Sequence, residues 1–295
     1  MPSAFQEEFF VSFEYWFMLP ISILVATVAM ASGVEGATFF SPLFILALRL
    51  PPEIAIGTAL ITEVFGFASG LFAYYRKRLI DYHLGFSLLL ATVPMAILGT
   101  LATTYIPAVF LQVILGVGLF VVALSFLRQP AHAEIAHLDR AISAEYGGEK
   151  AETCLITADG EEIRYTVCNR REGGLIAGVG ALFMGMVSTG LGEMNGYFLL
   201  QRCRVPSKVS VATSVFVVAI TALIASAGHL AQFIRAGGDA LPTVLNICLF
   251  TVPGVIIGGQ VGSRVASLIP QRTLEISLAV LFILVAALTL GQVIL

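Results

Sequence analysis

Long apolar runs separated by short polar segments extend along most of the chain. Six of these runs are about 20 residues long, the length that an α-helix needs to cross a hydrocarbon core of roughly 30 Å. They cover residues 54–75, 84–104, 107–127, 207–231, 240–262 and 271–293. Two further apolar stretches, 17–48 and 173–200, are longer than an ordinary span and contain glycine-rich interruptions. The pattern predicts an all-α polytopic membrane protein.

The two interruptions are alike in sequence. The first is Ser32-Gly33-Val34-Glu35-Gly36, and the second is Ser188-Thr189-Gly190-Leu191-Gly192-Glu193. Each places a carboxylate among helix-breaking glycines, and an acid at membrane depth is by default a candidate functional residue. We therefore expect a broken helix in each stretch.

The segments that follow the interruptions also correspond to one another. Residues 48–58 align with 203–213, with arginine, proline and threonine in the same places. Residues 92–99 align with 251–258, and both copies contain Thr-Val-Pro. The correspondence predicts a duplicated chain with three parts: a first transmembrane repeat at 1–128, a linker at 129–172 and a second transmembrane repeat at 173–295.

Basic residues indicate how the repeats are oriented, because Lys and Arg concentrate in cytoplasmic loops. The clusters Arg76–Arg78 and Arg202–Lys208 lie on the same side only if 173–200 returns as a hairpin. Each repeat then consists of a broken-helix hairpin plus three transmembrane helices, and the two repeats are inverted. Of the 16 Lys and Arg residues, only Arg49 and Arg235 would lie outside. Inverted repeats with broken helices are typical of secondary transporters.

Composition excludes a soluble globular protein. Hydrophobic residues make up 58% of the chain, charged residues 12%, and the mean hydropathy is +0.93. Soluble domains contain about 25% charged residues. Glu7, Glu8 and Glu14 stand where a cleavable signal peptide needs basic residues, so we expect the first hydrophobic segment to be retained. We expect a multi-pass protein of the cell (inner) membrane, with the linker in the cytoplasm and both termini outside.

The linker differs in composition from the rest of the chain. Apolar residues at helical spacing predict a short amphipathic helix within 131–146. The segments 153–158 and 161–168 predict a β-hairpin around Asp159-Gly160, a strong turn signal. We interpret this small insert as an ordinary solvated surface, with a regulatory or partner-binding role as the alternative. Cys154 and Cys168 flank the hairpin, and in the cytoplasm we expect their thiols to be reduced.

The glycine-rich breaks predict an anion site. A half-helix that begins at a break presents free N–H groups and the positive end of its dipole, which favour an anion. Hydroxyl groups near the breaks could contribute, although they could equally bond to the carbonyl one turn back. The candidate substrate-binding residues are Ser32, Gly33, Glu35, Gly36, Thr58, Thr62, Glu63, Thr189, Gly190, Gly192, Glu193, Asn195, Thr213 and Ser214.

Three intramembrane acids suggest how transport is driven. Burial disfavours the charged form of a carboxyl group, so Glu35, Glu63 and Glu193 could be neutral near pH 7 and titrate as their surroundings change. We assign proton coupling to Glu35 and Glu193. The structural alternative is a protonated Glu that bonds to a broken helix end and holds it rigid. Val218 occupies the position of Glu63 in the second repeat, so Glu63 is a candidate for selectivity.

Several of these motifs together resemble a known family. The glycine-rich breaks followed by a proline (Gly33 to Pro42), the segment Ala55-Ile56-Gly57-Thr58-Ala59 and the aromatic-basic loop from Tyr74 to Asp81, with their second copy, are similar to the TauE/SafE sulfite exporter family of membrane permeases. The resemblance implies transport of sulfite, thiosulfate or a small organosulfur anion such as a sulfonate. The family often has a run of glycines where this chain has Val34-Glu35-Gly36.

The leading hypothesis is therefore a secondary transporter, an exporter of a small anion. Its partners would be that anionic substrate and the lipid bilayer, with no nucleic acid; the oligomeric state stays open. One alternative is a cation-coupled carrier or channel that uses the intramembrane Glu residues, and another is a membrane scaffold that transports nothing. The sequence has neither a His-rich metal cluster nor a Ser/Lys dyad, so we expect no enzymatic activity, no cofactor and no metal site.

Overall fold

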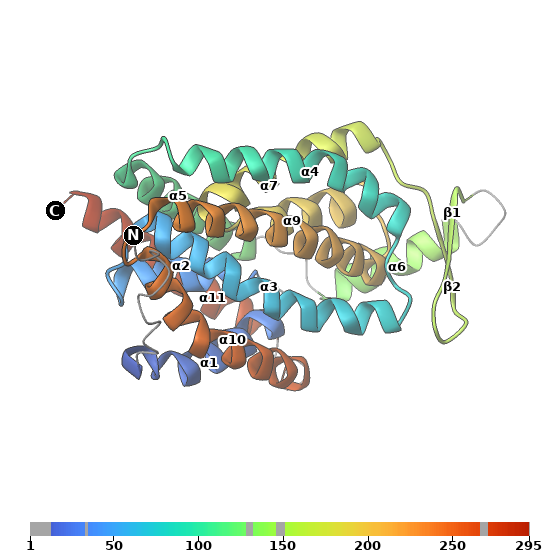
Figure 1. Cartoon of the computed structure of the whole chain (residues 1–295). Helices are drawn as coiled ribbons and strands as arrows, with labels where there is room; N and C mark the ends of the chain where they lie inside the picture. The colour runs from blue at the N-terminus through green and yellow to red at the C-terminus, as the bar shows by residue number, and fades with distance from the viewer. Residues whose placement is uncertain (1–12, 33–34, 128–131, 146–150, 266–270, 295) are drawn as a thin grey trace.

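The protein is a bundle of long helices with a small insert at one end (Figure 1). The structure is a computed structural model and describes residues 13–32, 35–127, 132–145, 151–265 and 271–294.

Six helices of the described chain are long and apolar enough to cross a membrane. They are α3 (Pro52–Arg76), α4 (Tyr82–Thr103), α5 (Ala108–Leu127), α9 (Ser207–Ala236), α10 (Ala240–Val265) and α11 (Gln271–Ile294). Each covers one of the six predicted runs, so the prediction of an all-α polytopic membrane protein is confirmed at this level. A short 3-10 helix, η1 (Phe13–Tyr15), precedes the bundle.

The helix ends follow from local sequence. Pro51 and Pro206 immediately precede α3 and α9, where the missing N–H of proline costs no helical hydrogen bond. Asp81 caps α4, because its carboxylate accepts a hydrogen bond of 3.0 Å from the N–H of Leu84. Gly237 ends α9 with a φ of 66°, a left-handed conformation that glycine adopts without strain.

Both interrupted stretches are broken helices, as predicted. The first comprises α1 (Met18–Ser32) and α2 (Ala37–Leu46), and the second comprises α7 (Arg170–Val187), α8 (Leu191–Gly196) and the π-helical segment η2 (Tyr197–Arg202). In the second break, Ser188 and Gly190 have φ values of 61° and 113°, which interrupt the helical hydrogen bonds. Gly33 and Val34 lie outside the described residues.

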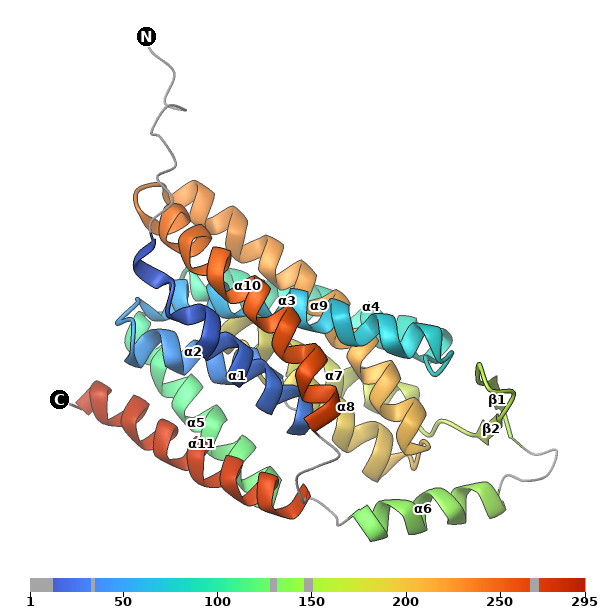
Figure 2. The ribbon, with the colours of Figure 1, turned by 90° about the horizontal axis from the view of Figure 1, so that it is seen from below.

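The helices pack in a few extensive pairs. α1 packs on α10 and α4 packs on α7, while α3 lies against α9 and α5 against α11 (Figures 1 and 2). Glycines allow the first two pairs to approach closely. A Cβ on Gly99 would lie 2.2 Å from the carbonyl oxygen of Leu182, and one on Gly258 would lie 2.4 Å from that of Ile23. Small residues serve this purpose in many membrane helices.

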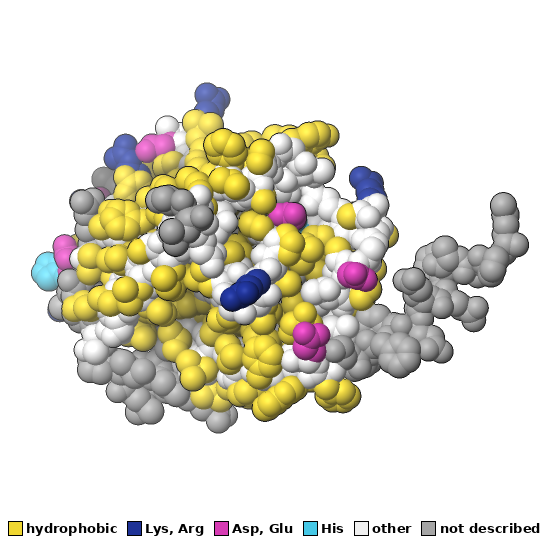
Figure 3. Space-filling model, turned by 90° about the vertical axis from the view of Figure 1, so that its left-hand side faces the viewer, with side chains coloured by type: hydrophobic (Ala, Val, Ile, Leu, Met, Phe, Trp, Pro, Cys, Tyr) yellow, Lys and Arg dark blue, Asp and Glu magenta, His cyan; other side chains and the backbone are white. Residues whose placement is uncertain are grey.

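Apolar side chains dominate the surface as well as the core. Leu90 and Tyr105 are 82% and 85% exposed, and the end of the molecule in Figure 3 shows charged side chains scattered singly among hydrophobic ones. Contiguous apolar surface of this kind is rare on monomeric soluble proteins. The surface therefore suits contact with lipid.

The insert contains the predicted helix and hairpin. It consists of α6 (His132–Glu145) and the antiparallel strands β1 (Thr153–Ile156) and β2 (Glu162–Tyr165), with Ile156 paired to Glu162. It lies at the end of the bundle opposite the start of α1 and the end of α11 (Figure 1).

Specific contacts hold the insert against the bundle. The hydroxyl of Tyr165, which is fully buried, donates a hydrogen bond of 2.7 Å to the carboxylate of Asp81. The N–H of Ser207, at the start of α9, donates a hydrogen bond of 2.9 Å to Asp139 on α6. Lys208 and Glu161 form an ion pair at 2.9 Å. The insert therefore touches the ends of helices from both halves of the chain and is more than a solvated surface.

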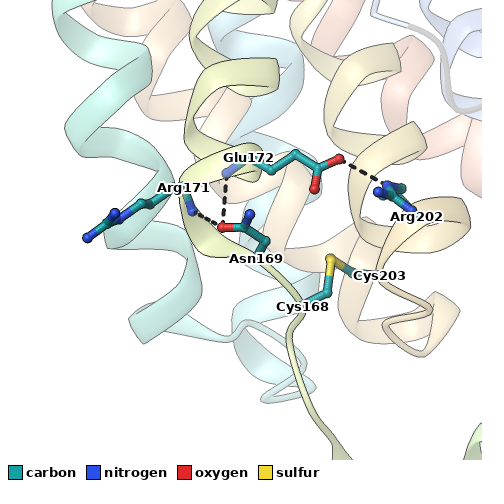
Figure 4. Close-up of polar contacts among 6 residues, drawn as sticks. All are labelled: Cys168, Asn169, Arg171, Glu172, Arg202 and Cys203. Carbon is teal, nitrogen blue, oxygen red and sulfur yellow. Dashed lines mark hydrogen bonds and ion pairs between the residues drawn. A yellow bond between two sulfur atoms is a disulfide. The ribbon is translucent and has the colours of Figure 1, made fainter.

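The expectation of reduced thiols is wrong for Cys168, which forms a disulfide with Cys203 (Figure 4). Their Cα atoms are 5.1 Å apart, within the range that disulfides require. The prediction considered only the two cysteines beside the hairpin. It missed this pair because the second broken helix folds back and brings the end of η2 beside the start of α7. Cys154 is free and exposed, and Cys248 is free and buried.

Candidate functional site

The two breaks meet inside the bundle. The carboxyl group of Glu35, at the first break, accepts a hydrogen bond from the N–H of Gly192 in the first turn of α8. The hydroxyl of Thr38, one turn further, donates a hydrogen bond of 2.9 Å to that of Thr189. The hydroxyls of Ser41 and Ser188 also form a hydrogen bond. Residues far apart in the sequence therefore join the start of α2 to the second break.

Three acids gather at this contact, and we call Glu35, Glu63 and Glu193 the carboxyl cluster. Glu35 and Glu63 are only 4% and 3% exposed, and Glu193 is partly buried. The three carboxyl groups are close enough to interact electrostatically. Among the described residues, no Lys or Arg forms an ion pair with any of them. Like charges in a low-dielectric interior repel strongly, so the cluster needs protons or a bound cation.

Several buried polar atoms at this site lack hydrogen-bond partners in the described part of the chain. They are Oε2 of Glu35, Oε2 of Glu193 and both side-chain amide atoms of Asn195. The carboxyl oxygens of Glu63 also lack a partner of good geometry, although the backbone N–H groups of Gly36 and Ala37 are close enough to interact with them. Asn195 is fully buried on α8, two residues after Glu193. Buried polar groups in native proteins are nearly always satisfied, and an exception calls for an explanation. A concentration of such atoms at one place is what a small polar ligand would satisfy.

Two glycines border the carboxyl cluster, with different amounts of free space. A Cβ on Gly192 would lie 2.7 Å from Oε1 of Glu35, so that carboxyl group could not keep its position. A Cβ on Gly36 would lie 3.7 Å from Oε1 of Glu63, an ordinary contact distance. Gly192 is therefore required for the approach of Glu35, whereas Gly36 tolerates a methyl group.

An open groove of about 510 Å³ with an almost wholly apolar lining lies beside Glu193. Its walls come from α5, α7 and the second broken helix, and its lining residues are Ser125, Leu175, Ile176, Val179, Glu193, Met194 and Tyr197. Glu193 is the one ionisable carboxyl group in this lining. The groove has the size of a small-molecule site, but its accessible surface is apolar and Glu35 and Glu63 are not part of its lining.

The candidate hydroxyl groups are mostly used elsewhere. Thr58 donates to the carbonyl of Ile54 at 2.7 Å, one turn back on its own helix. Thr62 pairs with Thr251 on α10 at 2.9 Å. Thr213 accepts a hydrogen bond of 3.0 Å from the N–H of Asp81. Ser214 is half-buried, and Ser32 is the last residue of α1.

The structure thus divides the predicted site. It brings Glu35, Gly36, Glu63 and the stretch from Thr189 to Asn195 to one place, while the hydroxyls of Thr58, Thr62 and Thr213 make structural bonds. Sequence analysis missed Thr38, Ser41 and Ser188, which join the breaks. Their position within two turns of a break was a usable signal.

The arrangement suits the handling of protons and of a small polar solute. Acids without basic partners change charge readily, and backbone N–H groups at a helix start favour anionic groups, as the bond from Gly192 to Glu35 illustrates. Within the described chain, no group of three His, Cys, Asp or Glu side chains has the geometry to hold a metal ion.

Six spanning helices around two broken helices that meet at buried acids are the features of a multi-pass membrane transporter. Comparison with known proteins agrees. The chain matches the family described as "Sulfite exporter TauE/SafE" over residues 18–289. It belongs to this family, which confirms the resemblance expected from the sequence.

A curated relative has the same general character. The chain is 22% identical to "Probable membrane transporter protein YunE" of Bacillus subtilis (strain 168) over 276 residues, which cover 91% of this chain and 94% of that protein. No solved structure matches the chain.

Proposed function

We propose that the protein is a secondary active transporter that exports a small anion, either sulfite or an organosulfur compound such as a sulfonate, with movement of protons. The family's description supports the substrate class. The observation that carries the proposal is the carboxyl cluster at the meeting of the two breaks, with its unpartnered oxygen atoms beside unpartnered Asn195. These atoms define a polar site within an apolar bundle.

Helix packing supports the proposed inverted repeats. In the proposed correspondence, α1 matches α7, α3 matches α9, α4 matches α10 and α5 matches α11. A two-fold axis between the repeats would then relate the contact of α1 with α10 to the contact of α7 with α4. Both pairs are extensive, and so are α3–α10 and its counterpart α9–α4. The helices α3 and α5 pack on their own counterparts, α9 and α11, as they would beside such an axis. Alternating access in many secondary transporters is a movement of one such repeat against the other.

The proposed orientation has the insert in the cytoplasm and both termini outside, in the cell (inner) membrane. Arg76, Lys77 and Arg78 lie at the end of the bundle that carries the insert, since the carbonyl of Lys77 accepts a hydrogen bond of 3.0 Å from Ala158. Arg202 and Lys208 form ion pairs at the same end. Clustered basic residues favour the cytoplasmic side.

In the proposed mechanism, protons make the site acceptable to an anion. An ionised carboxyl cluster would repel a sulfite ion, so anion binding requires proton uptake. Glu35 and Glu193 take up these protons, and the anion takes the place of the Glu35 carboxyl group at the N–H of Gly192, at the start of α8. Glu63, beside Gly36, contributes to selectivity. The potential across the membrane, negative inside, favours outward movement of the net negative charge that remains on the anion and its protons, by about 2.3 kcal/mol per charge and 100 mV.

One observation favours a second candidate, a cation-coupled carrier. The carboxyl cluster has no basic partner within the described chain, and oxygen ligands of this kind also bind Na⁺. In that case a cation would take the place of the protons.

A binding panel on the purified protein tests these candidates. Thermal stability is measured with sulfite, sulfoacetate, sulfate and Na⁺ at constant ionic strength, because a ligand that binds the folded state raises the melting temperature. We expect stabilisation by sulfite or sulfoacetate that grows as the pH falls. Stabilisation by Na⁺ alone would contradict the anion proposal and favour the cation carrier.

A further inference from the structure

The cross-link between Cys168 and Cys203 connects the two ends of the second broken helix. Cys168 precedes α7, and Cys203 follows η2, so the disulfide closes a loop that contains the second break and Glu193. The same two ends are joined by an ion pair of 2.9 Å between Glu172 and Arg202 (Figure 4). Opening the disulfide would leave only noncovalent contacts between these ends: this exposed ion pair, which is weak, and the packing of Phe198 on Gly173.

The first repeat has no equivalent of this cross-link. Leu48 occupies the position that aligns with Cys203, and all four cysteines of the chain lie after residue 150. The cross-link is therefore a property of one repeat. It acts on the half of the site that supplies Gly192 and Glu193.

The two cysteine residues differ in exposure. Cys168 is exposed, whereas Cys203 is only 7% exposed. Arg170, Arg171, Arg202 and Arg204 lie within three residues of the two cysteines along the chain. Clustered positive charge raises the local concentration of an anion, and a neighbouring cation stabilises a leaving thiolate. A nucleophilic anion would therefore attack Sγ of Cys168 and expel Cys203.

We propose that this disulfide is a covalent sensor for sulfite, the substrate class assigned under the proposed function, on which this inference rests. The lone pair on the sulfur of sulfite forms a bond to Sγ of Cys168 while the Cys168–Cys203 bond breaks, and the electron pair of that bond leaves on Sγ of Cys203. The products are an S-sulfonate on Cys168 and a thiolate on Cys203. Atoms and charge balance without any oxidant or reductant.

The reverse step restores the cross-link. When sulfite is scarce, the thiolate of Cys203 attacks Sγ of Cys168, and sulfite leaves with the electron pair of the S–S bond. This is ordinary exchange at a disulfide sulfur, with sulfite in place of a thiol. In the proposed orientation the sensor faces the cytoplasm, where disulfides are usually transient or regulatory and where the solute to be exported accumulates. The opened form lacks the covalent restraint on the second broken helix, which favours its movement.

Peptide mapping of the full-length purified protein tests the chemistry. The oxidised protein is incubated with sulfite, or with sulfate as an anion without a nucleophilic sulfur, and free thiols are then alkylated. We expect sulfite to produce the S-sulfonate on Cys168 and an alkylated Cys203, and removal of sulfite before alkylation to restore the disulfide. Cys154, a free exposed thiol, is the internal control and should carry no sulfonate. A disulfide that stays intact in sulfite, or that opens equally in sulfate, or that is absent from the purified protein overturns the sensor.

Transport in proteoliposomes separates this inference from the proposed function. We expect prior exposure to sulfite to raise the initial rate of sulfite flux in the wild type, and to leave the rate unchanged in the variant Cys168→Ser/Cys203→Ser. An equal increase in both proteins overturns the sensor. Absence of sulfite flux in both proteins contradicts the proposed function, while the peptide map still decides whether the disulfide reacts.

Discussion

At the residue scale, the site depends on close contact between a carboxyl group and a glycine backbone. Glu35 crosses from the first break to the N–H of Gly192 in the second. The approach is possible because Gly192 has no side chain: any Cβ there would occupy the place of the carboxyl oxygen. The contact joins the two halves of the chain at the point where the unpartnered polar atoms gather.

The variant Gly192→Ala should therefore lose transport while staying folded. The methyl group displaces the carboxyl group of Glu35 from its hydrogen bond, a loss of about 1–3 kcal/mol, but it meets only the flexible end of a side chain. Flux in proteoliposomes and thermal stability are measured together. Gly196→Ala is the matched control on the same helix, because its Cβ would have nothing within 4 Å. Full transport by Gly192→Ala would show that the Glu35 contact is dispensable.

The sequence predicted part of this site. The acids and glycines were visible because each break carries them, and the duplication implied that the breaks would meet. The roles of Thr58 and Thr213 were not predictable. A hydroxyl near a break has several possible partners, and only the packing of α4 on α9 brings the N–H of Asp81 to Thr213.

At the element scale, close helix pairs and a docked insert hold the bundle together. The helix ends were predicted within a few residues, since apolar length, prolines and glycines specify them. The cross-link between Cys168 and Cys203 was not predicted, because their proximity depends on how the second broken helix folds back.

Close packing of α1 on α10 and of α4 on α7 should be sensitive to a single methyl group. Gly258→Ala and Gly99→Ala each place a Cβ within 2.4 Å of a backbone carbonyl on the neighbouring helix, and overpacking of this kind costs about 1–3 kcal/mol. We expect a lower melting temperature for both variants. Gly66→Ala, which has open space at its Cβ, should be neutral or slightly stabilising because alanine favours helix. Equal stability of all three variants would contradict the packing.

The stability that docking of the insert contributes should decrease at alkaline pH. Burial raises the pKa of Tyr165, and the neighbouring charge of Asp81 raises it further. An exposed tyrosine has a pKa of about 10. Tyr165 keeps its proton to a higher pH in the folded protein than in the unfolded chain. Its hydrogen bond therefore contributes fully to the free energy of unfolding below pH ~10, and this contribution decreases as the pH rises above that value.

The variant Tyr165→Phe tests this interaction. It leaves Asp81 without its hydroxyl donor, which should cost about 1–3 kcal/mol, and it removes the contribution of this residue to the alkaline loss of stability. Unfolding is measured from pH 8 to pH 11 in both proteins. Identical pH profiles would mean that Tyr165 is not the group responsible.

At the scale of the whole molecule, the proposed transport mechanism depends on how the chain crosses the membrane. The insert and the clustered basic residues lie at one end of the bundle, while α1 begins and α11 ends at the other (Figure 1). The distribution of Lys and Arg predicted this separation from sequence alone. The inverted repeats remain a proposal that helix packing supports.

Single cysteines test the proposed orientation. In a background without native cysteines, a cysteine replacing Lys77 should react with an impermeant reagent only from the cytoplasmic side, and one replacing Gly237 only from outside. The two positions follow the ends of the corresponding helices α3 and α9, which run in opposite directions if the repeats are inverted. Reaction of both from the same side would contradict the inversion.

The central claim is that an anion crosses the membrane with protons carried by the carboxyl cluster. Sulfite flux is measured in proteoliposomes under imposed pH gradients for the wild type, Glu35→Gln and Glu193→Gln, with protein-free liposomes as the baseline. The Gln side chain keeps the size and the hydrogen-bond acceptor but cannot titrate. We predict faster wild-type flux from the more acidic side, and flux without this dependence in both variants. Unchanged dependence on the pH gradient in both variants would contradict proton coupling at these residues.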